Sequence, residues 1–110
     1  MTARTTIPRD AVLLIVDVQQ GMDRYAERYH RNNPDLEANI GRLQRAWRET
    51  GRPIIHVQHL SKEPNSPLRP GQAGVEFKDE VRHDLCRVRC DRDIRQHGAR
   101  WQAVRVHVAA

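Results

Sequence analysis

Two short apolar runs stand out in the first sixty residues of the chain. Residues 11–16 form a continuous apolar, β-branched run that Asp17 closes. The run is too short for a typical helix and does not alternate, so it predicts a strand at 11–17 that is buried on both faces of a parallel sheet. A second run, residues 53–58, starts at Pro53 and predicts another strand.

Between these runs the apolar residues recur at helical spacing. The stripe consists of Leu36, Ile40, Leu43 and Trp47. Asn33 can accept hydrogen bonds from the first turn, and Pro34 suits the first helical position. Gly51 can adopt the left-handed conformation that ends a helix. We therefore predict a helix at residues 34–50, preceded by a short helical turn near residues 23–29.

Strand, helix and strand in this order predict a right-handed βαβ unit. Sites in such units lie beyond the carboxyl ends of the strands, which places Asp17 and His59 at the same edge of the sheet. Simple alternation puts His56 on a different face from His59 and gives it a structural role. After a long loop at residues 59–74, alternation at Val104, Val106 and Val108 gives a weak strand signal.

Size and composition restrict the classes of protein to consider. With 110 residues there is room for one small domain, and no apolar run reaches the length of a membrane span. No apolar segment of a secretory signal follows the N-terminus. Two cysteines are too few for a disulfide scaffold, so we expect a cytoplasmic protein without membrane contact.

The charge is distributed unevenly. Residues 1–81 carry 12 Lys and Arg against 11 Asp and Glu, whereas residues 82–110 carry 7 Arg against 3 Asp. Both cysteines and three of the six histidines also lie after residue 81. The composition therefore divides the chain into residues 1–81 and a basic tail, residues 82–110.

Three ordered strings resemble the isochorismatase-like cysteine hydrolases. They are AVLLIVDVQQGM at 11–22, GRPIIHVQH at 51–59 and SPLRPGQAGVEF at 66–77. The resemblance covers about residues 9–81. It implies an α/β fold, a Rossmann-like three-layer sandwich with a parallel sheet, of which residues 1–81 form a truncated N-terminal part. A sheet that lacks its later strands is expected to expose an edge and apolar surface.

The chemistry that the resemblance implies uses an Asp, a Lys and a Cys on a small amide, ester or vinyl-ether substrate, with no cofactor and no metal. A thiolate attacks the substrate carbon after the Asp accepts its proton, and the Lys favours the thiolate. Asp17 matches the catalytic Asp. The resemblance makes Gln19 a residue that shapes the pocket floor, and topology makes His59 a substrate contact. The alternative for Gln19 is a solvated loop amide without a role in the pocket. The alternative for His59 is a partly buried histidine at the strand end that is bonded to backbone.

The resemblance does not supply the other two catalytic residues. Lys78 is the last lysine and precedes the expected position, and the family's cysteine comes later than this chain extends. Cys86 and Cys90 lie in a string that resembles no nucleophile motif, so neither takes that role. We expect little or no hydrolase activity, because a base without its nucleophile has nothing to deprotonate.

The basic tail allows further interpretations. Its composition, rich in Arg, His, Cys and Val without Lys, is typical of a shifted reading frame in a GC-rich gene, and it can also be a disordered segment. Cys86, Cys90, His83 and His97 lack the regular second ligand pair of a structural zinc site. The alternatives to a hydrolase lineage are an interaction module that associates with itself or a partner through an open sheet edge, and, on tail charge alone, a nucleic-acid binder.

Overall fold

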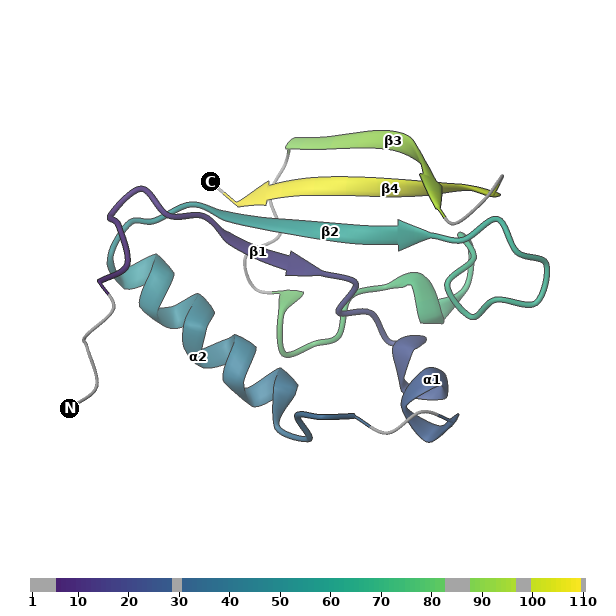
Figure 1. Ribbon diagram of the computed structural model, residues 1–110, viewed down its shortest axis with the longest axis horizontal. Coiled ribbons are helices and arrows are strands. Elements are labelled where there is room, and N and C mark those ends of the chain that lie inside the picture. Colours follow the sequence, from purple (N-terminus) through teal and green to yellow (C-terminus); the bar gives the residue numbers. More distant parts are fainter. Residues whose placement is uncertain (1–5, 29–30, 83–87, 97–99, 110) are drawn as a thin grey trace.

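The computed structural model describes residues 6–28, 31–82, 88–96 and 100–109. The elements in chain order are β1 (Leu13–Val16), α1 (Met22–Arg28), α2 (Leu36–Glu49), β2 (Ile54–Leu60), a 3₁₀ turn (Ala73–Val75), β3 (Val88–Gln96) and β4 (Arg100–Ala109). The four strands form one sheet in the order β1-β2-β4-β3, and both helices lie below the strands in Figure 1. No helix in these ranges is both long enough and apolar enough to cross a membrane.

The predicted βαβ unit is confirmed. β1 and β2 pair in parallel, with Leu13 opposite Ile54 and Val16 opposite Val57. The rest of the sheet is not parallel as expected, because β4 pairs antiparallel with β2 and β3 pairs antiparallel with β4. β4 contains the alternating valines of the tail, so the weak strand signal there is confirmed. The α/β fold is therefore built on a mixed sheet.

The core lies between β1, β2, α2 and the segment that follows the 3₁₀ turn. Its buried residues are Ile15, Val18, Trp47, Ile54, Phe77 and Val81. Two side chains of α2 also bond to backbone outside the helix, Trp47 Nε1 to the Ala11 carbonyl at 2.9 Å and Gln44 Nε2 to the Val81 carbonyl at 2.9 Å. These bonds satisfy polar groups that burial would otherwise leave unpaired, and they fix α2 against the sheet.

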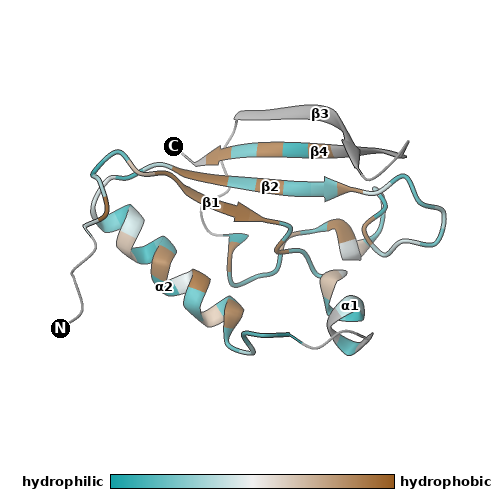
Figure 2. Cartoon of the chain, in the orientation of Figure 1, coloured by the Kyte–Doolittle hydropathy of each residue, from teal (hydrophilic) through white to brown (hydrophobic). Residues whose placement is uncertain are grey.

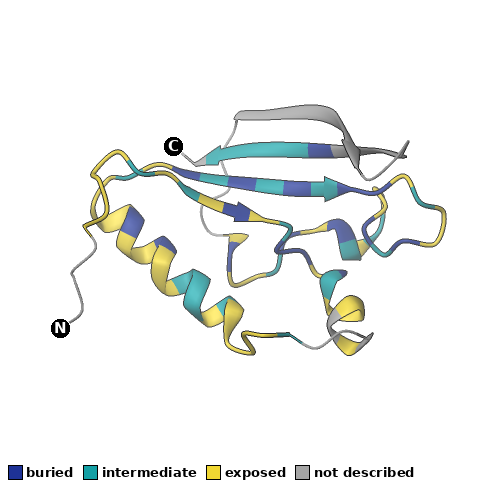
Figure 3. Cartoon of the chain, viewed as in Figure 1, coloured by how far each residue is buried: buried dark blue, intermediate teal, exposed yellow. Residues whose placement is uncertain are grey.

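β1 is not buried on both faces, which corrects the prediction from its apolar sequence. It is the first strand in the sheet order, and its side chains alternate between buried and exposed (Figure 3). Ile15 faces α2 and is 3% exposed, whereas Leu14 and Val16 on the opposite face are 57% and 51% exposed. Of the three expected layers, the described residues form a helical layer and a sheet, and the predicted exposed apolar surface is confirmed.

The ends of α2 agree only in part with the sequence signals. Asp35, not Asn33, occupies the N-cap position, and no side chain caps the helix there. Asn33 Oδ1 instead accepts a bond from Asn39 Nδ2 at 3.3 Å, so the predicted Asn33 cap is wrong. At the other end Gly51 has a φ of +68° and the Arg52 amide donates to the Trp47 carbonyl at 2.9 Å, which confirms the glycine stop.

Candidate functional site

Asp17 lies at the carboxyl end of β1, where the topology predicts a site. Its amide donates to the Val57 carbonyl at 2.9 Å, which extends the pairing of β1 with β2 by one residue. Its φ of +60° lies in the left-handed region, and in the described ranges no other residue except glycine has a positive φ. Aspartate tolerates this conformation better than most residues, and backbone of this kind is common at functional sites.

The environment of Asp17 disfavours its charge. Burial raises the pKa of the Asp17 carboxyl above its usual value, and the charge of His59 opposes this rise without cancelling it. A carboxylate that binds a proton more readily than usual is suited to accept one from a substrate or a nucleophile. The side chain that the resemblance makes the catalytic base therefore has the electrostatics of a proton acceptor.

Replacing Asp17 by Asn is expected to stabilise the fold at pH 7, because it removes a charge that burial disfavours. The folded-state pKa is raised, so ionisation of Asp17 costs stability as the pH rises through that pKa. Well below the ordinary aspartate pKa of 3.8 the carboxyl is protonated in the folded and the unfolded state, so the stability difference disappears. Urea unfolding at pH 7 and at a pH below the ordinary aspartate pKa measures the stability difference between wild type and Asp17→Asn. The control is Asp10→Asn, because Asp10 is exposed. A destabilising Asp17→Asn at pH 7 would contradict the unfavourable charge.

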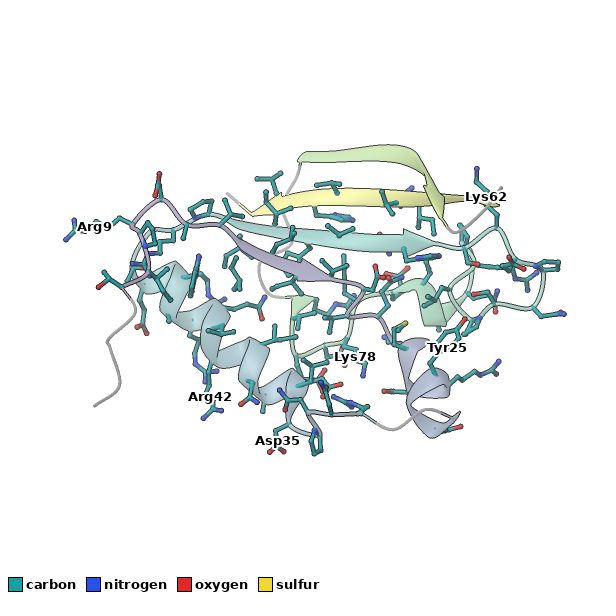
Figure 4. All side chains as sticks on the ribbon, in the orientation of Figure 1. Arg9, Tyr25, Asp35, Arg42, Lys62 and Lys78 are labelled. Atoms are coloured by element: carbon teal, nitrogen blue, oxygen red, sulfur yellow. The ribbon has the colours of Figure 1, made fainter. Side chains whose placement is uncertain are left out.

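Asp17 borders a cavity of about 450 Å³. Its wall is mixed, with apolar side chains from β1 and the helices facing a cluster of charges. The principal lining residues are Val16, Asp17, Met22, Tyr25, Arg31, Leu36, Glu37 and Lys78. In Figure 4 the Lys78 side chain lies between α1 and the start of α2, with Tyr25 on α1. The cavity is large enough for a small organic molecule.

The charged part of this wall is a network centred on Glu37. Lys78 Nζ lies 2.6 Å from both Glu37 Oε1 and Asp23 Oδ1, and Arg31 Nη2 lies 2.8 Å from Glu37 Oε2. The bond from Arg31, with that from Lys78, lowers the pKa of Glu37 to about 2 although burial opposes the change. Burial alone would lower the pKa of Lys78, but its bonds to Asp23 and Glu37 raise it. The network therefore stays ionised at neutral pH and connects α1, α2 and the segment around residue 78.

Gln19 is completely buried, so its interpretation as a solvated loop amide is wrong. Its Oε1 accepts the His59 amide N–H at 2.8 Å, and its Nε2 donates to the carbonyls of His59 at 2.9 Å and Val75 at 2.8 Å. The side-chain amide thus bonds to β2 as the backbone of a further strand residue would. Gln19 does not line the cavity. Its bonds to the His59 backbone hold β2 to the turn that carries Asp17.

The two histidines of β2 differ as predicted. His59 is half-buried near the end of the strand, where its charge acts on Asp17, although it does not line the cavity. His56 is fully buried on the other face, and its ring contacts Phe77 edge-on at 5.4 Å between centroids. The structure therefore brings Asp17 and His59 together at one sheet edge, and His56 is structural as predicted.

The cysteines are not brought to Asp17 as far as the described residues show. Cys90 lies in β3, where the register aligns it through Val106 and Val57 with Val16, the neighbour of Asp17. Two strands intervene, which separates the backbones by about 14 Å at the usual spacing. Cys86, His83 and His97 lie outside the described residues. In the part of the chain that the structure describes, no three His, Cys, Asp or Glu side chains form a metal cluster.

The network of Asp23, Arg31, Glu37 and Lys78 was not identified from the sequence. From the sequence alone, Glu37 is only a negative charge that favours the start of a helix. Lys78 is a lysine that precedes the position expected for the family's catalytic lysine. Their proximity depends on the return of residues 61–77 to the end of β1, where Gln19 and Phe77 form an isolated bridge. No local periodicity encodes that return.

Comparisons with known proteins agree with this geometry. The family model described as the isochorismatase domain matches residues 11–98. An uncharacterized isochorismatase family protein, YrdC of Bacillus subtilis strain 168, is 39% identical over 72 residues, which are 64% of this chain and 37% of YrdC. A crystal structure assigned as a hydrolase of the isochorismatase family, from Chromobacterium violaceum ATCC 12472, superposes with a TM-score of 0.64 at 41% identity. The superposition covers 74% of this chain and 42% of the Chromobacterium violaceum chain.

These matches extend over less than half of either relative, but over most of the chain described here. The matched region contains the whole βαβ unit, the cavity and residues 66–77. It also continues past residue 81 into the basic tail. The chain belongs to the isochorismatase family.

Proposed function

We propose that this chain carries the general base of a family hydrolase site and has no hydrolase turnover of its own. The substrate class of the lineage is a small amide, ester or vinyl ether. Asp17 is the proton acceptor, Gln19 holds β2 at the turn that carries Asp17, and His59 lies beside Asp17 at the same strand ends. The observation that carries the proposal is the half-buried Asp17 carboxyl, with its raised pKa, at the border of a 450 Å³ cavity.

Lys78 does not replace the family's lysine. It lines the same cavity as Asp17, but both its close partners are the carboxylates of Asp23 and Glu37 at 2.6 Å. A cation that is already neutralised by two carboxylates does little to stabilise a thiolate. The electrostatic role of the triad lysine is therefore not filled by Lys78.

The nucleophile is also not supplied by Cys90. Attack requires a thiol within hydrogen-bond reach of its base, at about 3 Å, whereas the register holds the Cys90 backbone two strands away from β1. Among the described residues, Asp17 thus keeps the position and the proton affinity of a catalytic base without a cysteine within reach to deprotonate.

Hydrolysis assays test this proposal. Purified chain, incubated with small amides, esters and vinyl ethers, is expected to give no turnover above buffer. Asp17→Asn, Cys86→Ser and Cys90→Ser are expected to give the same background. A turnover that any of these three substitutions abolishes would contradict the proposal, because it would identify a working base or nucleophile.

A second candidate is an interaction module that pairs through its open sheet edge. It is favoured by the position of β1 at the end of the sheet order and by its strongly apolar sequence (Figure 2). Pull-down with a full-length family member and size-exclusion chromatography of the chain alone distinguish this role. A monomer that captures no relative would contradict it.

A further inference from the structure

Apolar side chains from three elements converge on the cavity beside Asp17. Val16 on β1, Tyr25 on α1 and Leu36 on α2 all line it. These side chains are 51%, 39% and 37% exposed, so each keeps apolar surface that the described residues do not cover. Exposed apolar side chains that gather in one concave site are typical of a ligand pocket. The cavity therefore offers a place for the apolar body of a small molecule.

The charged network in the cavity wall, Asp23, Arg31, Glu37 and Lys78, has no net charge. Glu37 bonds to both cations, at 2.8 Å to Arg31 and 2.6 Å to Lys78, and Asp23 bonds to Lys78 at 2.6 Å. The side chains of Lys78 and Glu37 are only 12% and 17% exposed, so water screens their attraction weakly. Asp17 lines the same cavity and adds a negative charge to the wall when it is ionised.

We propose that the cavity binds small uncharged carboxamides with an apolar body and excludes the corresponding carboxylates, with Glu37 as the residue that determines this selectivity. The inference rests on the proposed role of the cavity as the substrate site. A carboxylate ligand would meet the like charge of Asp17, while Arg31 and Lys78 are already bonded to carboxylates of the protein. An uncharged carboxamide meets no like charge, and its N–H can donate to Asp17.

This selectivity separates substrate from product in a hydrolase site. Addition of water to a primary carboxamide breaks its C–N bond and gives a carboxylate and ammonium. A wall that accepts the uncharged amide and repels the carboxylate holds the substrate more tightly than the product. The charged network thus has a role in ligand choice as well as in connecting α1, α2 and residue 78.

The position of Glu37 between the two cations makes its charge decisive. Glu37→Gln keeps the size of the side chain but removes the charge that neutralises Arg31. Lys78 retains Asp23 as its anionic partner at 2.6 Å. The guanidinium of Arg31 then becomes available to a ligand carboxylate, which it can bind through two parallel hydrogen bonds. The variant is therefore expected to gain carboxylate binding and to keep carboxamide binding.

NMR titration of the isotope-labelled whole chain at neutral pH tests the inference with two probes of the same shape, cyclohexanecarboxamide and cyclohexanecarboxylate. Wild type is expected to bind the carboxamide with a Kd of about 1–10 mM, and the carboxylate at least about tenfold more weakly. The largest shifts are expected at the amides of Met22, Tyr25 and Lys78, which line the cavity. Glu37→Gln is expected to bind the carboxylate at least about tenfold more tightly than wild type, with the carboxamide Kd within about threefold.

Two further variants separate a local effect from a general effect of charge. Glu27→Gln removes the same charge from an exposed residue of α1 that does not line the cavity. Both of its Kd values are expected to stay within about twofold of wild type. Adding Arg31→Gln to Glu37→Gln is expected to abolish the gain in carboxylate affinity, because the freed cation is then absent. Circular dichroism checks the fold of each variant, and the comparison of the two probes on wild type needs no variant.

Four results would overturn the inference. They are no carboxamide binding to wild type up to about 20 mM, a wild-type carboxylate Kd within about threefold of the carboxamide Kd, no gain in carboxylate affinity in a folded Glu37→Gln, and shifts confined to residues outside the cavity. The same spectra report any conversion of the carboxamide to the carboxylate. Conversion would contradict the proposed lack of turnover without changing the ratio of the two Kd values, whereas equal affinity for both probes would contradict only the selectivity.

Discussion

Replacing Gln19 by Leu is expected to destabilise the fold by about 3 kcal/mol, a large fraction of the stability of a domain of this size. The leucine side chain fills a similar volume but cannot bond. It leaves the amide and carbonyl of His59 without the Gln19 amide and removes one of two donors from the Val75 carbonyl. Buried backbone groups that lose their partners carry the full cost of desolvation.

Urea unfolding measures this loss, and the neighbouring residue supplies the control. Gln20 is an exposed glutamine, so Gln20→Leu is expected to change the free energy of unfolding by less than about 0.5 kcal/mol. Loss of cooperative unfolding in Gln19→Leu agrees with the expectation. A change below about 1 kcal/mol would show that the Gln19 amide does not hold β2 to the end of β1.

Replacing Gly74 by Ala is the second change with a large expected effect, about 2–4 kcal/mol of destabilisation. A Cβ at this position would collide with the backbone carbonyl of Pro67 and would lie 3.2 Å from the Cα of Gly21. The Gly21 amide donates to the Gly74 carbonyl at 2.8 Å, so the two backbones are already in direct contact. None of these backbone atoms can move without separating residues 66–77 from the turn after β1.

The same substitution at Gly41 gives the opposite sign. Gly41 lies inside α2, where a Cβ would have only the Glu80 carbonyl as a neighbour, at 3.9 Å. Gly41→Ala is therefore expected to stabilise by about 0.5–1 kcal/mol, because alanine is the better helix former. Thermal unfolding of both variants checks the pair. A Gly74→Ala protein as stable as wild type would contradict the close approach at Gly21.

The sequence predicts those features that local patterns encode. The apolar runs predict β1 and β2, the stripe from Leu36 to Trp47 predicts α2, and the βαβ topology then brings Asp17 and His59 to one edge. The exposed face of β1 could not be predicted in this way. An apolar run has the same sequence whether one or two layers cover the strand. Leu14 is exposed because it lies on the face opposite Ile15, and among the described residues α2 packs only on the Ile15 face.

The charged wall of the cavity depends on contacts between distant residues. Glu37 and Lys78 are 41 residues apart and meet because residues 61–77 return to the end of β1. The full burial of Gln19 depends on the same return, since Val75 provides one of its three bonds. The resemblance located Asp17, but the partners of Asp17 and Gln19 required the three-dimensional arrangement.

The composition change after residue 81 remains a prediction about the gene. If a shifted frame produced residues 82–110, another reading frame after codon 81 is expected to encode a segment with a lysine where the family has its own. The backbone forms strands at 88–96 and 100–109, and the family match extends to residue 98. Absence of such a segment from both alternative frames would count against the hypothesis.

Alkylation kinetics test, without knowledge of a substrate, whether Asp17 deprotonates either cysteine of the chain. Iodoacetamide labelling of Cys86 and Cys90, followed by peptide mass spectrometry from about pH 6 to pH 9, gives a rate for each thiol. Because Asp17 is expected to deprotonate neither cysteine, Asp17→Asn should leave both alkylation rates within about twofold of wild type at every pH. A cysteine that reacts rapidly at about pH 6.5, and whose rate changes about tenfold or more in Asp17→Asn, would contradict it.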